Sequence, residues 1–95
     1  VFAPFFNIQT ATIAATARLA KIPNTVVIPY FFIRTDKGYT MSFDAPLMDY
    51  PSSDAVDNAT RTNQILHDQI LKAPEQYLWI HRRFKTRPKG ETYFY

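Results

Sequence analysis

Five cations lie near the end of the sequence, interleaved with aromatic and other apolar residues. They follow the apolar group at residues 77–80 and are Arg82, Arg83, Lys85, Arg87 and Lys89. Guanidinium groups bind phosphate through paired hydrogen bonds, and long cationic side chains reach outward while their stems pack on apolar surface. The pattern predicts an anion-facing edge at which Arg82, Arg83 and Lys85 contact a substrate.

Arg34 is the fourth candidate for substrate binding. It follows residues 25–33, the most apolar segment of the chain, which carries no charged side chain. Ligands of α/β sheets tend to bind beyond the carboxyl ends of strands. We therefore expect Arg34 to lie near a bound ligand.

Metal binding, cysteine chemistry, phosphate binding by a glycine-rich loop and serine hydrolysis have little support in the sequence. The histidines, His67 and His81, have no carboxylate at metal-ligand spacing, and there is no cysteine and no glycine-rich phosphate loop. Ser42, Ser52 and Ser53 lie outside any nucleophile elbow. The sequence thus disfavours a metal site and a serine hydrolase site in this chain.

The positive charge is unevenly distributed. The chain has a formal net charge of +3, and residues 74–95 hold five of its eleven Lys and Arg against only Glu75 and Glu91. Such a patch suits phosphate groups, anionic lipid or an acidic protein, or it is an ordinary solvated end. Nucleic acid is disfavoured as a partner because the cations gather in one tail and no nucleic-acid-binding motif is present.

The apolar pattern predicts the elements that position these residues. We expect a strand at residues 1–6, a helix capped by Thr10 at 10–22, and a central strand covered on both faces at 25–33. Gly38 ends a turn that makes a hairpin with residues 39–43. A helix with Ser53 or Asp54 as N-cap follows to Lys72, before the basic tail. The predicted fold class is α/β, a mixed sheet flanked by helices in the order strand, helix, strand, strand, helix and tail.

The length of 95 residues suits one small domain with a marginal core. Tyr77 and Trp79 are expected to pack as anchors in that core. The chain begins within an apolar run, where native termini are usually polar. We interpret residues 1–95 as the C-terminal portion of a single larger domain. No run reaches the ~20 apolar residues that a membrane-spanning helix needs.

Residues 73–88, with the sequence Ala-Pro-Glu-Gln-Tyr-Leu-Trp-Ile-His-Arg-Arg-Phe-Lys-Thr-Arg-Pro, resemble the C-terminal signature of the bacterial lipid A biosynthesis acyltransferases. The apolar start at residues 1–6, the Thr-rich residues 10–12 and the Val-Pro segment at 26–29 resemble that family more weakly. The resemblance implies transfer of a fatty acyl chain from acyl carrier protein to a hydroxyl of the lipid A precursor. It also implies a location at the cytoplasmic face of the bacterial inner membrane and no cofactor.

The catalytic motif implied by the resemblance is a His followed by Asp or Glu five positions later. Lys72 stands five positions after His67, and Thr86 stands five after His81. We therefore expect the upstream catalytic part to be absent and the chain alone to be inactive.

Two other interpretations remain open. One is a non-catalytic module that binds an anionic membrane or another glycolipid through its basic tail. The other is a related acyltransferase that acts on a different glycolipid acceptor.

Overall fold

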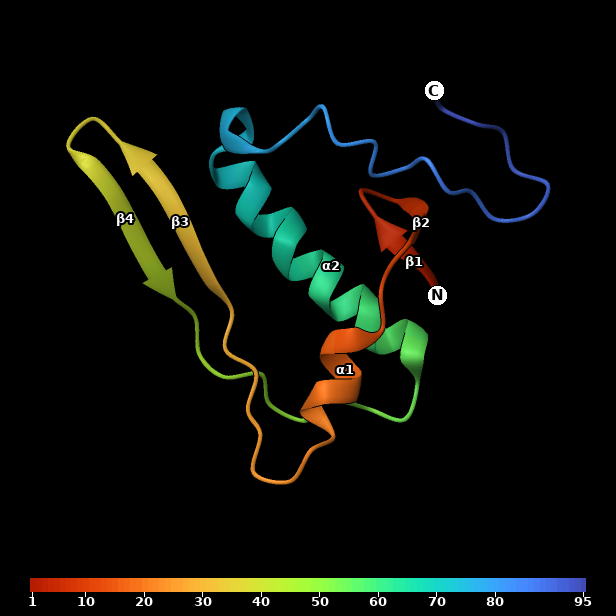
Figure 1. Ribbon diagram of the computed structural model, residues 1–95, viewed down its shortest axis with the longest axis horizontal. Helices are drawn as coiled ribbons and strands as arrows, with labels where there is room; N and C mark the ends of the chain where they lie inside the picture. Colours follow the sequence, from red (N-terminus) through yellow and green to blue (C-terminus); the bar gives the residue numbers. More distant parts are fainter.

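Two antiparallel β-hairpins lie on opposite sides of one long helix (Figure 1). The computed structural model describes all residues, 1–95. Its extents of 47 × 38 × 16 Å make it flat, with the helix between the hairpins. The elements in chain order are β1 (Phe2–Phe5), β2 (Ile8–Ala11), α1 (Ala15–Ala20), β3 (Tyr30–Thr35), β4 (Gly38–Phe43), α2 (Ala55–Lys72) and the 3₁₀ turn η1 (Pro74–Gln76).

The first hairpin joins β1 to β2 through the two residues Phe6 and Asn7. Both have positive φ, 50° and 61°, as the central residues of a type I′ turn require. Thr10 lies in β2, fully buried, and its hydroxyl donates to the Ile8 carbonyl at 2.7 Å. The expected helix at residues 10–22 is therefore wrong in its first third, because the β-branched Thr10 packs in a strand.

Helix α1 is short and is built on alanine. It begins after Ala14, which makes no side-chain cap, and it buries Ala17 and Ala20. These small side chains allow close approach to α2, which α1 contacts. Thr10 is thus not the N-cap, and the helix ends before Pro23.

The second hairpin confirms the predicted pairing of β3 with β4. Thr35 faces Gly38 at the turn and Tyr30 faces Phe43 at the open end. The expectation of a buried central strand at residues 25–33 is wrong, because the strand begins only after Pro29 and has one partner. Tyr30 and Phe32 are more than half exposed.

The α/β composition is confirmed, but the sheet differs from the expected mixed sheet. Each hairpin forms its own two-stranded antiparallel sheet, and no parallel pair joins them. The physical reason is that a strand joins a sheet only where a neighbour supplies matching peptide groups, and neither hairpin reaches the other. Isolated two-stranded hairpins are marginal without further packing.

Helix α2 matches its prediction closely. Its N-cap is Asp54, whose Oδ1 accepts hydrogen bonds from the backbone N–H groups of Val56 at 2.8 Å and Asp57 at 3.1 Å. It runs 18 residues to Lys72, and it buries Asn58, Ala59, Asn63 and Ile70. None of the helices is long and apolar enough to cross a membrane.

The buried core lies between β1 and α2. Only nine of the 95 residues are buried, with Ala3 and Phe5 of β1 among them. The radius of gyration is 14.9 Å, against about 12 Å for a compact domain of this length. Trp79 is 59% exposed, so its expected role as a core anchor is wrong, whereas Tyr77 is half-buried beside it. Much apolar surface is therefore uncovered.

We predict that Asp54→Ala lowers the free energy of unfolding by about 1 kcal/mol, because two N–H groups of the first turn lose their acceptor. Thermal unfolding followed by circular dichroism measures the change. Ser53→Ala is the matched control, since Ser53 is exposed and accepts no capping bond. Equal melting of both variants would contradict the assignment of Asp54 as the cap.

Candidate functional site

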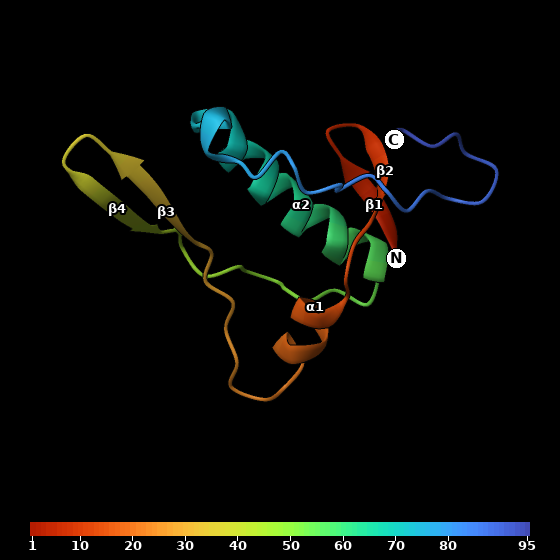
Figure 2. The ribbon, with the colours of Figure 1, turned by 45° about the horizontal axis from the view of Figure 1, so that its top comes forward.

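The basic tail follows η1 and runs past the first hairpin without regular structure (Figure 2). Hydrogen bonds from side chains, and not strand pairing of the backbone, hold the tail beside the hairpin. Arg83 and Arg87 both donate to backbone carbonyls of β2, on Ala11 and Gln9. The cations of the tail consequently divide into those that turn inward and those that face solvent.

Arg83 turns inward. Its guanidinium donates to the Ala11 carbonyl, to the Thr12 hydroxyl at 3.3 Å and to Oδ1 of Asn63 at 3.4 Å. It also lies 5.2 Å from the centre of the Phe5 ring, a cation–π distance. Three of the N–H donors of this arginine are used within the protein.

Arg87 is fixed in a similar way. It donates to the Gln9 carbonyl at 2.8 Å and pairs with the Glu91 carboxylate at 3.0 Å. Its guanidinium lies 4.5 Å from the centre of the Phe94 ring, and its side chain is only 7% exposed. Arg87 thereby anchors the tail on both sides of the turn at residues 88–91.

Arg82 and Lys85, which lie on either side of Arg83 in the sequence, face solvent. They line a cavity of about 370 Å³ together with Thr86, Arg87, Tyr93 and Tyr95. The side chains of Arg82 and Lys85 make no hydrogen bond, and the Arg82 guanidinium lies 5.7 Å from the centre of the Tyr95 ring. No carboxylate lines this cavity, and because Arg87 is paired with Glu91, its unpaired positive charge comes from Arg82 and Lys85. The arrangement suits an anionic group, with hydroxyl and phenol groups as further donors.

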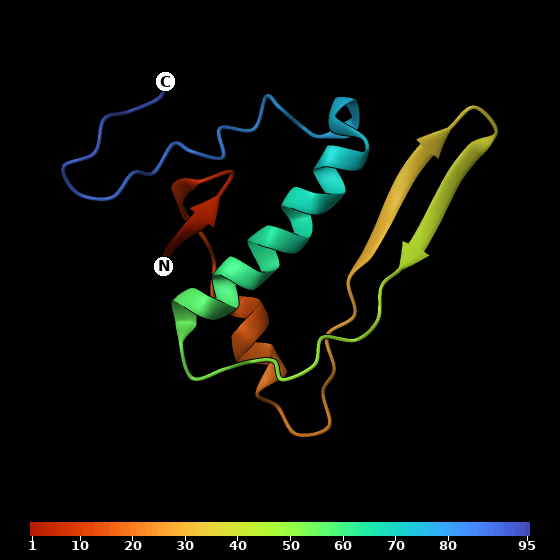
Figure 3. The same ribbon diagram turned by 180° about the vertical axis from the view of Figure 1, so that it is seen from behind.

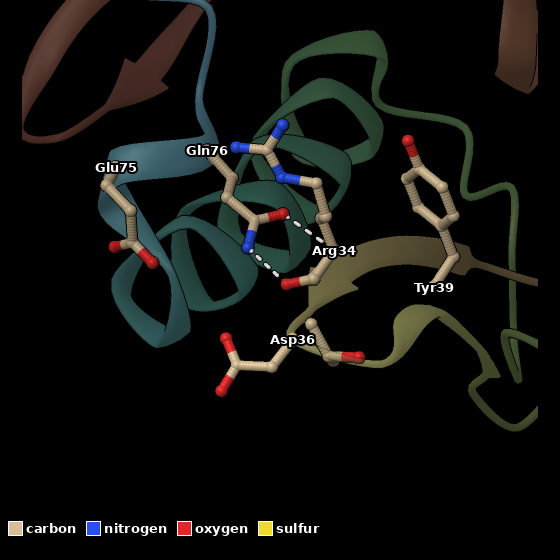
Figure 4. A pocket seen from close by; sticks show the side chains of 6 residues that line it. Arg34, Asp36, Tyr39, Glu75 and Gln76 are labelled. Atoms are coloured by element: carbon tan, nitrogen blue, oxygen red, sulfur yellow. Dashed lines mark hydrogen bonds between the residues drawn. The ribbon is translucent and has the colours of Figure 1, made fainter.

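Arg34 lies in a different cavity, at the far end of β3 (Figure 4). This cavity of about 570 Å³ is lined by Thr35, Asp36, Tyr39, Glu75 and Gln76 as well as Arg34. One positive and two negative side chains share it, a balance that disfavours a phosphate. The structure thus places Arg82 and Lys85 together and Arg34 apart from them.

The Arg34 backbone, by contrast, is tightly held. The side-chain amide of Gln76 accepts from its N–H and donates to its carbonyl, both at 2.9 Å, as the dashed lines in Figure 4 mark. This pair of bonds imitates the pairing of a neighbouring strand. Gln76 therefore fixes η1 against the end of β3.

The histidines take no part in either cavity. His67 packs on the Phe6 ring at 4.3 Å, and its Nδ1 lies 3.0 Å from the Asp68 carboxylate. Hydrogen bonds from His67 and then from Gln64 hold the pKa of Asp68 below its usual value. Stabilisation from a depressed pKa is present at neutral pH and fades as pH falls through the lowered value. No group of three His, Asp or Glu side chains that could hold a metal ion is present.

Sequence reasoning missed Asn63, Tyr93 and Tyr95. Asn63 lies within the predicted helix that ends at Lys72 and was not singled out, yet it is 4% exposed and donates to the Pro4 carbonyl and the Thr12 hydroxyl. A polar residue at a buried position of an amphipathic helix was the available signal. The two tyrosines gave no such signal, since they lie past the basic segment.

Comparison with known proteins identifies the family. A family profile described as bacterial lipid A biosynthesis acyltransferase matches residues 1–86. The chain belongs to this family. The matched range includes Arg34, Arg82, Arg83 and Lys85, whereas Arg87, Tyr93 and Tyr95 lie beyond it.

Individual relatives agree with this assignment. The chain is 39% identical to the lipid A biosynthesis palmitoleoyltransferase of Escherichia coli over 97 residues, which cover 99% of this chain and 31% of the relative. It is 40% identical to the lauroyltransferase of the same organism, with 95% and 30% covered. A lipid A biosynthesis acyltransferase of Haemophilus influenzae is 41% identical, with 97% and 31% covered. The chain thus spans about a third of the length of these acyltransferases.

We predict that substitution of the two adjacent arginines changes stability by different amounts. Arg83→Ala should lower the free energy of unfolding by about 3 kcal/mol, because a charged donor is lost and the buried Asn63 loses a partner. Arg82→Ala, the matched control, should change it by less than about 1 kcal/mol, since only an exposed cation–π contact is lost. Chemical denaturation measures both. Equal losses would mean that the inward position of Arg83 carries no special stability.

Proposed function

We propose that this chain is the C-terminal portion of an enzyme that acylates the lipid A precursor in lipopolysaccharide biosynthesis. That longer protein is called the parent enzyme below. Family membership supports the proposal, as do the names of three relatives, which all state lipid A biosynthesis and two of which state different acyl groups. The acyl donor is acyl carrier protein, and the acceptor is a hydroxyl of the precursor.

The role of this chain in the reaction is to bind the lipid acceptor. The observation that carries the proposal is the cavity beside Arg82 and Lys85, two cations without hydrogen-bond partners in a lining free of carboxylates. The acceptor carries phosphate groups, for which guanidinium and ammonium groups are strong ligands. Arg83 contributes by positioning, because its bonds to Ala11 and Asn63 fix the backbone between Arg82 and Lys85.

The reacting base belongs to the parent enzyme outside residues 1–95. Neither His67 nor His81 is followed by Asp or Glu at the spacing of the family motif. His67 also directs Nδ1 to the neighbouring Asp68 and packs on Phe6, away from the Arg82 cavity. Acyl transfer therefore needs residues that this chain does not contain.

The same tail meets the membrane. Leu78, Trp79 and Ile80 are 65%, 59% and 87% exposed, and they directly precede the basic residues. An exposed apolar group with a tryptophan, next to cations, suits the interface of an anionic bilayer. We place this surface at the cytoplasmic face of the inner membrane of a Gram-negative bacterium, where the lipid acceptor is presented. No cofactor takes part in the proposal.

A binding module without catalysis is the second candidate function. The exposed apolar group and its adjacent cations favour membrane binding whether or not acyl transfer occurs. Kinetic measurements on the parent enzyme separate the two functions.

We predict that Lys85→Ala in the parent enzyme raises KM for the lipid acceptor about tenfold and leaves KM for the acyl donor nearly unchanged. The reason is the loss of a charge-assisted bond of about 1.5–3 kcal/mol to phosphate. Steady-state kinetics with each substrate varied in turn measure the effect. Lys89→Ala is the control, since Lys89 is an exposed cation of the same tail outside the cavity.

Arg82→Lys sharpens this test. It retains the charge but loses the planar fork, so a paired phosphate contact should weaken whereas a diffuse surface charge should not. Wild-type acceptor kinetics in Arg82→Lys and Lys85→Ala together would overturn the assignment of this cavity.

We further predict that the 95-residue chain alone gives no turnover with acyl carrier protein donor and lipid A precursor. The reason is the missing catalytic base. Circular dichroism on the same sample establishes that the chain is folded, and the parent enzyme is the positive control. Turnover above background would show that a group within residues 1–95 does the chemistry.

A further inference from the structure

The last residues of the chain turn back on the basic tail. Figure 3 shows the C-terminal end returning toward the part of the tail that precedes it. Arg87 holds the start of the returning segment, because it pairs with Glu91 at 3.0 Å and its Nε donates to the Thr92 carbonyl at 3.3 Å. Residues 92–95 are called the strap below. The strap lies beyond the range that matches the family profile, residues 1–86.

Phe94 holds the strap against the tail. Its ring packs edge to face against Phe84, with 5.9 Å between the ring centres, and the Arg87 guanidinium lies 4.5 Å from its centre. Phe84 also donates its backbone N–H to the Tyr95 hydroxyl at 3.4 Å. Phe84 in turn stacks on the buried Phe5 of β1 at 5.8 Å. Aromatic contacts thus connect the strap to the core.

The two tyrosines of the strap lie on its other side. Tyr93 and Tyr95 both line the cavity of Arg82 and Lys85, whereas Phe94 between them does not. The strap contains no helical turn, and its side chains alternate in direction as they do along an extended chain. Tyr93 and Tyr95 are 76% and 61% exposed. The cavity therefore has two unpaired cations from the tail and two phenols from the strap.

These phenols have unused hydrogen-bonding capacity. The Tyr95 hydroxyl accepts from the Phe84 N–H, so its own proton remains available to a ligand. Cations alone bind any phosphate, but a tyrosine adds a ring that packs on apolar surface and a hydroxyl that bonds to polar groups. A sugar offers both kinds of surface, with C–H groups on the face of its ring and hydroxyl groups at its edge. The cavity therefore suits a phosphate that is attached to a sugar.

We propose that the strap makes this cavity specific for a sugar phosphate. Arg82 and Lys85 bind the phosphate, the Tyr95 hydroxyl donates to one of its oxygens, and the Tyr93 ring packs on the sugar. The Arg82 guanidinium lies 5.7 Å from the centre of the Tyr95 ring, so this phenol lies beside the cation that binds the phosphate. The inference rests on the proposed function and adds to it the residues that recognise the sugar part of the acceptor.

Competition by two small anions tests the strap in the parent enzyme. Glucose 1-phosphate and methyl phosphate are both phosphate monoesters and carry the same charge at about pH 8, but only the first has a sugar. We expect both to compete with the lipid acceptor. The inhibition constant of glucose 1-phosphate should be about tenfold lower than that of methyl phosphate, because only the sugar packs on Tyr93.

Variants of the two tyrosines separate their roles. Tyr93→Ala should abolish the preference for glucose 1-phosphate, and Tyr93→Phe, the matched control that keeps the ring, should retain most of it. Tyr95→Phe should raise both inhibition constants about fivefold, because one hydrogen bond to the phosphate is lost. Since both tyrosines are exposed, the melting temperatures should stay close to that of the wild type. A purely structural role of the strap would not change the preference between two anions of equal charge.

The possible results distinguish this inference from the proposed function. A preference for glucose 1-phosphate that is absent in the wild type, or unchanged in Tyr93→Ala, would overturn the role of the strap. If Lys85→Ala still weakens both anions in that case, the proposed function stands. Wild-type binding of both anions by Lys85→Ala and Arg82→Ala would mean that phosphate binds elsewhere, and would overturn both.

Discussion

The buried amide of Asn63 is the interaction on which the arrangement of this chain depends. It donates to the Pro4 carbonyl at 3.2 Å and the Thr12 hydroxyl at 3.0 Å, and it accepts from Arg83. One side chain of α2 thereby joins the first hairpin, the segment after it and the basic tail. A buried amide is tolerated only when its hydrogen bonds are made, so these parts must meet in one geometry.

The tail depends on this geometry because it has no backbone ladder of its own. Two arginines, Arg83 and Arg87, connect it to β2, and each also lies over a phenylalanine ring. Planar guanidinium groups can bond and stack at once, which an ammonium group does not do as well. The outward cations Arg82 and Lys85, on either side of Arg83, are thereby held in position while their own hydrogen-bond donors stay free. Because the tail is already ordered, little conformational entropy is lost when a ligand binds these cations.

Local patterns in the sequence predicted the local structure. The N-cap Asp54, the helical spacing to Lys72 and the turn at Gly38 each act over a few residues, and α2 and the β3–β4 hairpin follow from them. Thr10 shows the limit of such local prediction. A Thr- and Ala-rich segment suits a helix as well as a strand, and burial against β1 determines that Thr10 lies in a strand. The signature at residues 73–88 identified the family, because its odd composition is specific without any knowledge of the fold.

Contacts between residues far apart in the sequence determined the features that local patterns did not predict. Arg82 and Arg83 are neighbours of the same type, but Arg83 turns inward because Ala11 and Thr12, more than 70 residues earlier, lie beneath it. The prediction of a single mixed sheet was wrong for a related reason. A continuous apolar segment such as residues 25–33 indicates that a strand is to be covered, but not whether the covering residues are in the same 95. Tyr30 and Phe32 are therefore more than half exposed and the prediction of burial was wrong, because apolar composition indicates a tendency to be covered without supplying the covering partner.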